Sequence, residues 1–448
     1  MDLKDILLVP LYLPFVYLWA LWYRRNCADK ITRKYFLPAF TVKIIGAIAL
    51  GLIYQFYYGG GDTFNYFHDT RIIWEAFIKS PSVGINLVFA DGKYHDDLYQ
   101  YTRQMIFYGD QRSYPVVQVA GLLGFVTFST YTVTAIFFAI FCFTGVWALY
   151  QAFYAMFPQL HRQLAIAVFF IPSVFFWGSG LMKDTITLGA LGWGFYAFYF
   201  GLIRREKIVS NLIILIISFL ILKTIKIYIL QCFLPAAFLW FFLHNRSQIK
   251  SRALRILVLP VVLALAIPAG YFAVREVSKE DTRYNLDKIA FTAKETATWL
   301  EYMSKIDGGS GYSLGTFDGS FGSMLTKAPQ AVFITLYRPF LWEVRNPVML
   351  LSAIESTIFL FLTLRIFWEI KLVRLFQVLK SQPIVIFCFL FAIAFSFGVG
   401  LTSYNFGSLV RYKIQMMPFF LSALYIVRYQ ARPLKTQVKR PRKAARFA

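Results

Sequence analysis

Acidic side chains with the spacing of one helix face follow the second long apolar stretch of the chain. Three glycines, at positions 59–61, precede Asp62, and Asn65, Tyr66 and Asp69 come after it. If a helix begins at Asp62, intervals of three and four residues place these side chains on one face. A carboxylate there could take a proton from an attacking hydroxyl, and the glycines would let a ligand approach closely. The plainer interpretation is that Asp62 only caps a surface helix.

Basic side chains occur in four further segments at the ends of apolar stretches. With their polar and aromatic neighbours, they are Lys183 and Asp184; Lys223 and Lys226; Arg338, Trp342 and Glu343; and Arg411. Arginine binds phosphate through two parallel hydrogen bonds, and a lysine beside a helix N-terminus suits the same ligand. Each segment alone also has a simpler explanation: a turn with an internal ion pair, a cation that extends to the lipid headgroups, or an aromatic residue at the membrane boundary. Together they predict one outer cavity in which cations hold a phosphate and a carboxylate acts as base.

The composition indicates whether these segments are surrounded by water or by lipid. Of 448 residues, 58% are hydrophobic and only 15% are charged. A soluble protein of this length needs more polar surface, so we predict a membrane protein. The net charge of +23 then reflects loops that fix topology rather than a nucleic-acid partner. The four cysteines form no CxxC pair, which argues against a disulfide framework or a zinc site.

Eleven apolar stretches approach the length of about 17–25 residues that spans a bilayer. They cover residues 6–22, 36–57, 131–155, 164–180, 185–202, 209–223, 227–243, 256–274, 347–366, 383–401 and 414–428. The expected fold is therefore all-α: a membrane-embedded bundle of about eleven helices over residues 1–430. Residues 223–226 are expected to form either a turn between two spans or a break within one helix.

Lysine and arginine concentrate in alternate loops, which the positive-inside rule places in the cytoplasm. The N-terminus is then outside and the C-terminus inside, and the first stretch is a retained span rather than a cleaved signal. The longest loops, 59–131 and 275–346, face outward, and we expect helices near 116–128 and 287–306. The basic segment 431–448 is expected to be a disordered cytoplasmic tail that is attracted to membrane lipids.

The sequence resembles the bacterial GT-C glycosyltransferases, polytopic enzymes of cell-surface polysaccharide and lipid glycosylation. The resemblance rests on the topology, on Gly61-Asp62-Thr63 at the start of the first outer loop, and on Arg411-Tyr412 before the last span. The segment from Pro172-Ser173 to Lys183-Asp184 is also similar to a turn in such enzymes. The chain departs from the best-known pattern by having one span more ahead of the acidic loop.

The resemblance implies a transferase in the cytoplasmic membrane that uses a polyprenyl-phosphate-linked sugar and a lipid or glycan acceptor. Asp62 would be the general base for the acceptor hydroxyl. Lys183, Arg338 and Arg411 would bind the lipid phosphate and offset the charge that develops on it.

The remaining residues have supporting roles under the same resemblance. Tyr66 and Trp342 would stack on sugar, while Asp69 and His68 would support the base or complete a divalent-cation site. The sequence does not require a metal, because no recognisable ligand spacing is present. A surface-polysaccharide polymerase acting on lipid-linked repeat units is an alternative, because it would use the same cations. A flippase for a lipid-linked sugar is a second alternative, although the inverted repeats that it predicts are not visible.

Overall fold

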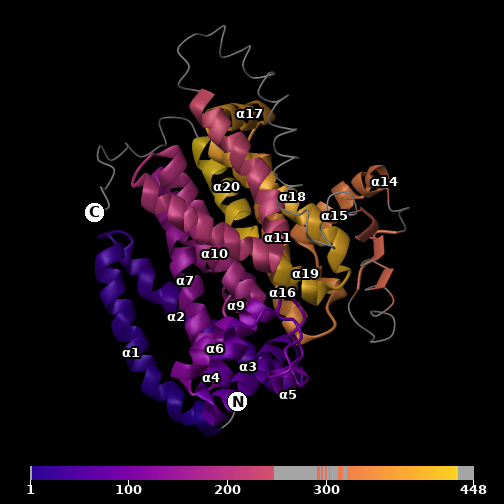
Figure 1. The fold of residues 1–448 in the computed structure, drawn as a ribbon. Helices are drawn as coiled ribbons and strands as arrows, with labels where there is room; N and C mark the ends of the chain where they lie inside the picture. The colour runs from indigo at the N-terminus through magenta and orange to yellow at the C-terminus, as the bar shows by residue number, and fades with distance from the viewer. Residues whose placement is uncertain are drawn as a thin grey trace. The chain divides into compact units, whose positions relative to one another are not determined.

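A computed structural model describes residues 3–246, 290–292, 294–295, 298–299, 302, 311–315 and 320–431 (Figure 1). Within these ranges the chain is helical, and its only β pairing is an isolated bridge between Gly311 and Asn405. The all-α prediction is confirmed for them. The predicted span 256–274, most of the predicted helix 287–306 and the tail from residue 432 onward lie outside the described residues.

The helices follow one another with short connections. Up to residue 246 they are α1 (Leu3–Cys27), α2 (Arg33–Leu52), η1 (Ile53–Tyr57), α3 (Asp62–Lys79), α4 (Pro81–Phe89), α5 (Tyr99–Thr102), α6 (Tyr114–Thr127), α7 (Tyr131–Met156), η2 (Pro158–Leu160), α8 (His161–Phe169), α9 (Pro172–Trp177), α10 (Lys183–Ala197), η3 (Phe198–Ile203) and α11 (Ile208–Arg246). From residue 321 they are α14 (Phe321–Thr326), α15 (Ala328–Tyr337), η4 (Leu341–Glu343), α16 (Pro347–Glu369), α17 (Leu372–Ser381), α18 (Pro383–Ser403), α19 (Phe406–Tyr412), η5 (Lys413–Gln415) and α20 (Met417–Gln430).

Seven helical segments among the described residues are long and apolar enough to cross a membrane. They are Leu3–Cys27, Arg33–Tyr57, Tyr131–Met156, Lys183–Ile203, Ile208–Arg246, Pro347–Glu369 and Pro383–Ser403. Each coincides with a predicted stretch, and Ile208–Arg246 covers two of them. Their length and composition indicate insertion into a membrane.

Two predicted spans differ from the observed helices because of local backbone features, and a third such feature decides between two predictions. The stretch 164–180 is divided into α8 and α9, where Pro172 lacks an N–H and disfavours helix in the residue before it. The stretch 414–428 begins with the short turn η5, and α20 has only 14 residues with Pro418 in its first turn. Lys226 has non-helical angles (φ −144°, ψ 74°) inside α11, so residues 223–226 contain a broken helix, as one of the two predictions stated.

The contacts divide the chain into two compact units. Unit 1 comprises Met1–Tyr150, Val174–Tyr196 and Ile213–Lys226, and unit 2 comprises Gln151–Ser173, Ala197–Leu212 and Ile227–Ala448. The prediction that residues 1–430 form one membrane-embedded domain stays a prediction.

Unit 1 has an apolar core between long helices and a smaller helical layer formed by α3, α4 and α6, which pack on one another (Figure 1). In the core, the Phe36 ring of α2 meets the Trp147 ring of α7 at a centroid distance of 4.7 Å. Helices α7 and α10 touch through glycines, because a Cβ on Gly145 would lie 1.9 Å from the carbonyl oxygen of Gly189. The turn into α3 needs glycine, since residues 59–61 have φ values of 69°, 136° and 124°.

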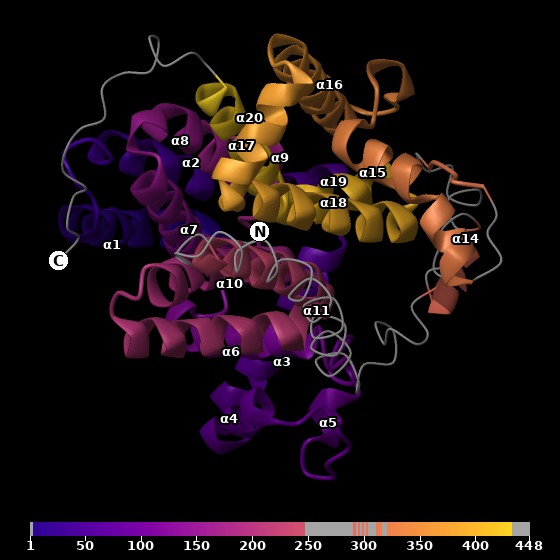
Figure 2. The ribbon, with the colours of Figure 1, turned by 90° about the horizontal axis from the view of Figure 1, so that it is seen from above.

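Unit 2 is built around α18, which packs on α15, α19 and α20 (Figure 2). Helices α15 and α18 lie so close together at Gly400 that a Cβ there would lie 2.4 Å from the carbonyl oxygen of Ala331. The Phe391 ring of α18 contacts the Phe419 ring of α20 at 5.0 Å. Helix α8 also packs on α20.

Candidate functional site

Oppositely charged side chains gather around the N-terminus of α10 in unit 1. Lys226 Nζ lies 2.5 Å from Asp184 Oδ1, and Lys183 Nζ lies 3.6 Å from Asp110 Oδ2. Lys183 also interacts electrostatically with Lys226 and with Arg112. We call these five residues the α10 cluster. Three cations and two carboxylates leave it with one net positive charge.

The Lys226–Asp184 pair forms the buried part of this cluster. Both side chains are almost inaccessible, and Lys226 occupies the break in α11. Such a pair replaces the hydration that each charge loses on burial. Of the two lysines expected to seek an anionic partner, Lys226 therefore finds it inside the unit, whereas Lys223 is exposed.

Asp110 is the accessible carboxylate of the cluster, and hydrogen bonds fix its position. Ser113 Oγ donates to Asp110 Oδ2, and the backbone N–H of Arg112 donates to Oδ1 at 3.0 Å. Burial raises the pKa of Asp110, but the two hydrogen bonds and the nearby Lys183 charge together hold that pKa below its usual value. Asp110 is therefore an ionised carboxylate at neutral pH.

Asp110, Arg112 and Ser113 were not among the residues that the sequence singled out. A signal was present, because a polar Asp-Gln-Arg-Ser run stands directly before Tyr114-Pro115 and an apolar helix. Acidic and hydroxyl side chains at such a position accept or donate hydrogen bonds in the turn that starts a helix. The contact of Asp110 with Lys183, about 70 residues away, has no sequence signal.

Helix α3 begins at Asp62, as predicted, and Gly61 occupies the N-cap position. Asp62 is half-buried in the first helical turn, where a carboxylate interacts favourably with the helix dipole. Tyr66, one turn later, is buried, with its ring stacked on Phe107 at 4.5 Å. Its hydroxyl lies 3.5 Å from the Oγ of Ser113, which in turn donates to Asp110, so Tyr66 connects α3 with the segment that carries Asp110.

Asp69 has structural contacts on both carboxylate oxygens. Oδ1 accepts the backbone N–H of Ile106 at 2.9 Å, and Oδ2 accepts that of Phe107 at 2.8 Å. The side chain is fully buried, and His68 Nδ1 lies 3.1 Å from Oδ1. These contacts give Asp69 the role of holding residues 106–107 against α3.

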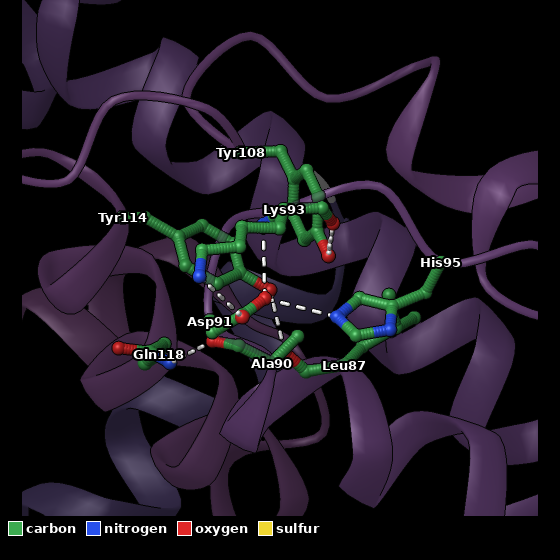
Figure 3. A network of polar contacts seen from close by, with 8 residues as sticks. All are labelled: Leu87, Ala90, Asp91, Lys93, His95, Tyr108, Tyr114 and Gln118. Atoms are coloured by element: carbon green, nitrogen blue, oxygen red, sulfur yellow. Dashed lines mark hydrogen bonds and ion pairs between the residues drawn. The ribbon is translucent and has the colours of Figure 1, made fainter.

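The loop after α4 is fixed by side chains that reach it from α6 and the preceding segment (Figure 3). Tyr108 donates its hydroxyl to the Lys93 carbonyl at 2.6 Å, and Gln118 Nε2 donates to the Ala90 carbonyl at 3.0 Å. Asp91 lies 2.9 Å from both the Lys93 backbone N–H and His95 Nε2. No group of three His, Cys, Asp or Glu side chains that could hold a metal occurs among the described residues.

The remaining predicted residues lie in unit 2. Arg338 is bound in bidentate fashion by Glu343, whose Oε2 also accepts the Phe340 backbone N–H at 2.8 Å. Burial raises the pKa of Glu343, but these hydrogen bonds and the Arg338 charge together lower it. Trp342 is 80% exposed and stacks on Phe340 at 4.7 Å. The guanidinium fork of Arg338 is therefore occupied by a carboxylate of its own segment.

Unit 2 also contains the predicted residue Arg411 and the buried carboxylate of Glu355. Arg411 is half-buried, and its guanidinium carbon lies 5.0 Å from the Tyr412 ring centroid. Glu355, inside α16, accepts the backbone N–H and the hydroxyl of Ser173, each at 2.7 Å. Lys413 donates to Ser356 Oγ at 3.1 Å and interacts electrostatically with Glu355.

The structure thus brings Lys183, Asp184 and Lys226 together in unit 1, and Arg338, Trp342 and Glu343 together in unit 2. No family model matches the chain, and neither a curated protein nor a solved structure matches it.

Proposed function

We propose that the chain is a membrane glycosyltransferase that moves a sugar from a polyprenyl-phosphate-linked donor to a lipid or glycan acceptor. The α10 cluster is the observation that carries the proposal. It holds three cations and two carboxylates, with one net positive charge, at the end of a helix that is long and apolar enough to span a membrane, where charge is costly and marks functional sites. A lipid phosphate matches this position, because its headgroup needs cations while its tail needs the adjoining apolar phase.

The proposed topology has eleven spans, with the N-terminus outside and the C-terminus in the cytoplasm. The two parts of α11 would count as two spans, and α8 with α9, and η5 with α20, would supply two more. The predicted span 256–274, which lies outside the described residues, would complete the eleven. Under this alternation, the N-terminus of α10 and the start of α3 face outward. The reaction would then occur at the outer face of the cytoplasmic membrane.

In the proposed reaction, the acceptor hydroxyl attacks the anomeric carbon of the donor. Asp62 takes the hydroxyl proton as the new C–O bond forms and the bond to the phosphate oxygen breaks. Polyprenyl phosphate leaves with the bonding electron pair, and Lys183 and Arg112 offset its charge. Arg338, Trp342 and Arg411 lie in unit 2, and their roles as substrate contacts stay predictions.

Lys183→Gln is expected to raise the KM for the lipid-linked donor by roughly tenfold or more, because a charge-assisted hydrogen bond contributes about 1.5–3 kcal/mol. The measurement is initial transfer rate against donor concentration in nanodiscs. Lys79→Gln is the matched control, because Lys79 is exposed at the far end of α3 and should leave KM unchanged. An unchanged KM in Lys183→Gln would remove Lys183 from the phosphate site.

A flippase is the second candidate, and one observation favours it. Helix α11 breaks at Lys226, and transporters place their substrates at broken helices. A flippase would move a lipid-linked sugar from one leaflet of a vesicle membrane to the other without forming a new glycosidic bond. A polymerase would instead form ladders of products, whereas the proposed transferase adds single sugars.

A further inference from the structure

Helix α17, which follows the spanning helix α16, is strongly amphipathic. Leu372, Phe376 and Leu379 recur at intervals of four and three residues, so they form one stripe. Arg374 lies on the opposite side of the helix. Within unit 2, α17 contacts α18 and α20, and the Val378 side chain is buried. The helix is therefore anchored along one edge of its surface.

The apolar stripe is mostly uncovered by the described residues. Leu372 is 68% exposed and Phe376 is 56% exposed. Trp368, in the last turn of α16, is 92% exposed. Tryptophan at the end of a span is typical of the boundary between headgroups and acyl chains. An amphipathic helix beside it has the composition of an interfacial helix, which buries its apolar stripe in that boundary.

The charges around the stripe indicate which headgroups lie against it. Lys371, directly before α17, and Lys380, in its last turn, are exposed. Arg374, on the side opposite the stripe, donates to the Ala431 carbonyl at 3.2 Å. The neighbouring acid, Glu369, accepts hydrogen bonds from Arg428 at 2.8 and 3.0 Å and from Arg365 at 2.9 Å. This carboxylate is thus compensated locally, and the surface is positive. A second copy of the same surface would bring like charges together, whereas anionic headgroups would neutralise them.

We propose that α17 and Trp368 form a lipid-binding surface that selects anionic phospholipid headgroups. The apolar stripe inserts between acyl chains, and Lys371 and Lys380 bind headgroup phosphates. Basic residues at a membrane surface each contribute to attraction toward anionic lipid. This surface is independent of the α10 cluster and of the proposed transferase activity.

The test compares lipid binding by the full chain in neutral detergent. Short-chain phosphatidylglycerol and phosphatidylcholine are titrated, and bound lipid is counted by native mass spectrometry. The variant is Lys371→Gln/Lys380→Gln, and the matched control is Arg71→Gln/Arg103→Gln, which changes two exposed cations of unit 1. Thermal midpoints confirm that both variants are folded.

The wild type and the control should prefer phosphatidylglycerol, and the α17 variant should lose roughly tenfold or more of that preference. Phe376→Asp should weaken binding of both lipids, because it places a charge in the inserted stripe. The proposal is overturned if the α17 variant keeps the wild-type preference or if the control loses as much. It is also overturned if light scattering shows a wild-type dimer that the α17 variant no longer forms, because the surface would then bind a second copy.

Discussion

Asp184→Asn and Lys226→Met are each expected to destabilise unit 1 by about 3–5 kcal/mol, because each leaves one buried charge without its partner. Asparagine retains the shape of the aspartate side chain but not its charge, so the loss isolates the electrostatic contribution. The measurement is the free energy of unfolding in mixed micelles or, where unfolding is irreversible, the thermal midpoint at constant lipid content.

Two comparisons separate this effect from a general response to charge removal. The double variant Asp184→Leu/Lys226→Met should recover most of the loss, because an apolar pair leaves no buried charge uncompensated. Arg204→Ala breaks the more exposed Arg204–Glu206 pair, with N and O 2.7 Å apart, and should cost below about 1 kcal/mol. Equal losses in Lys226→Met and Arg204→Ala would contradict a special role for the buried pair.

Gly145→Ala is expected to destabilise the packing of α7 against α10 by about 1–3 kcal/mol or more. The new Cβ would lie 1.9 Å from the carbonyl oxygen of Gly189, which is a backbone atom and cannot rotate away as a flexible side chain could. A Cβ on Gly192 would lie 2.1 Å from the carbonyl oxygen of Gly145, so a side chain on either helix would clash with the backbone of the other. Unfolding free energies of the purified variants provide the measurement.

Gly398→Ala is the matched control for this substitution. Gly398 also lies inside a candidate spanning helix, but apart from the adjacent backbone of its own helix, no atom of the described residues lies within 4 Å of the position that its Cβ would occupy. Alanine there should be neutral or should stabilise by up to about 1 kcal/mol, because glycine is the poorer helix former. If Gly145→Ala proves as stable as Gly398→Ala, the glycine contact between α7 and α10 is wrong.

Local signals in the sequence predicted much of the fold. Long apolar runs identified the helices, and the three glycines with Asp62 located the start of α3. Pro172 was also a local signal, but the apolar composition on both sides of it suggested one span where there are two short helices. A span predicted from the number of apolar residues in a window takes no account of a single proline, whose missing backbone N–H interrupts the helix.

The contacts of the α10 cluster could be predicted only in part. Lys183, Asp184 and Lys226 were recognised as unusual because charges at the ends of apolar segments are costly. Their pairing depends on tertiary packing, since Asp184 and Lys226 are 42 residues apart in sequence. The same holds for Asp69, which accepts hydrogen bonds from the backbone N–H groups of residues 106 and 107. The sequence alone could not distinguish this role from that of a catalytic acid.

The most direct test of the proposed function is a transfer assay that compares wild type with Asp62→Asn. Purified protein in nanodiscs is offered radiolabelled polyprenyl-phosphate and polyprenyl-diphosphate sugars, with membrane lipid extract as acceptor. We predict a new labelled product with wild type and a rate lower by about 10²–10⁴-fold with Asp62→Asn, at an unchanged thermal midpoint, because the general base is lost. The account is contradicted if Asp62→Asn transfers sugar as fast as wild type, or if neither protein forms product although both bind the lipid-linked sugar equally.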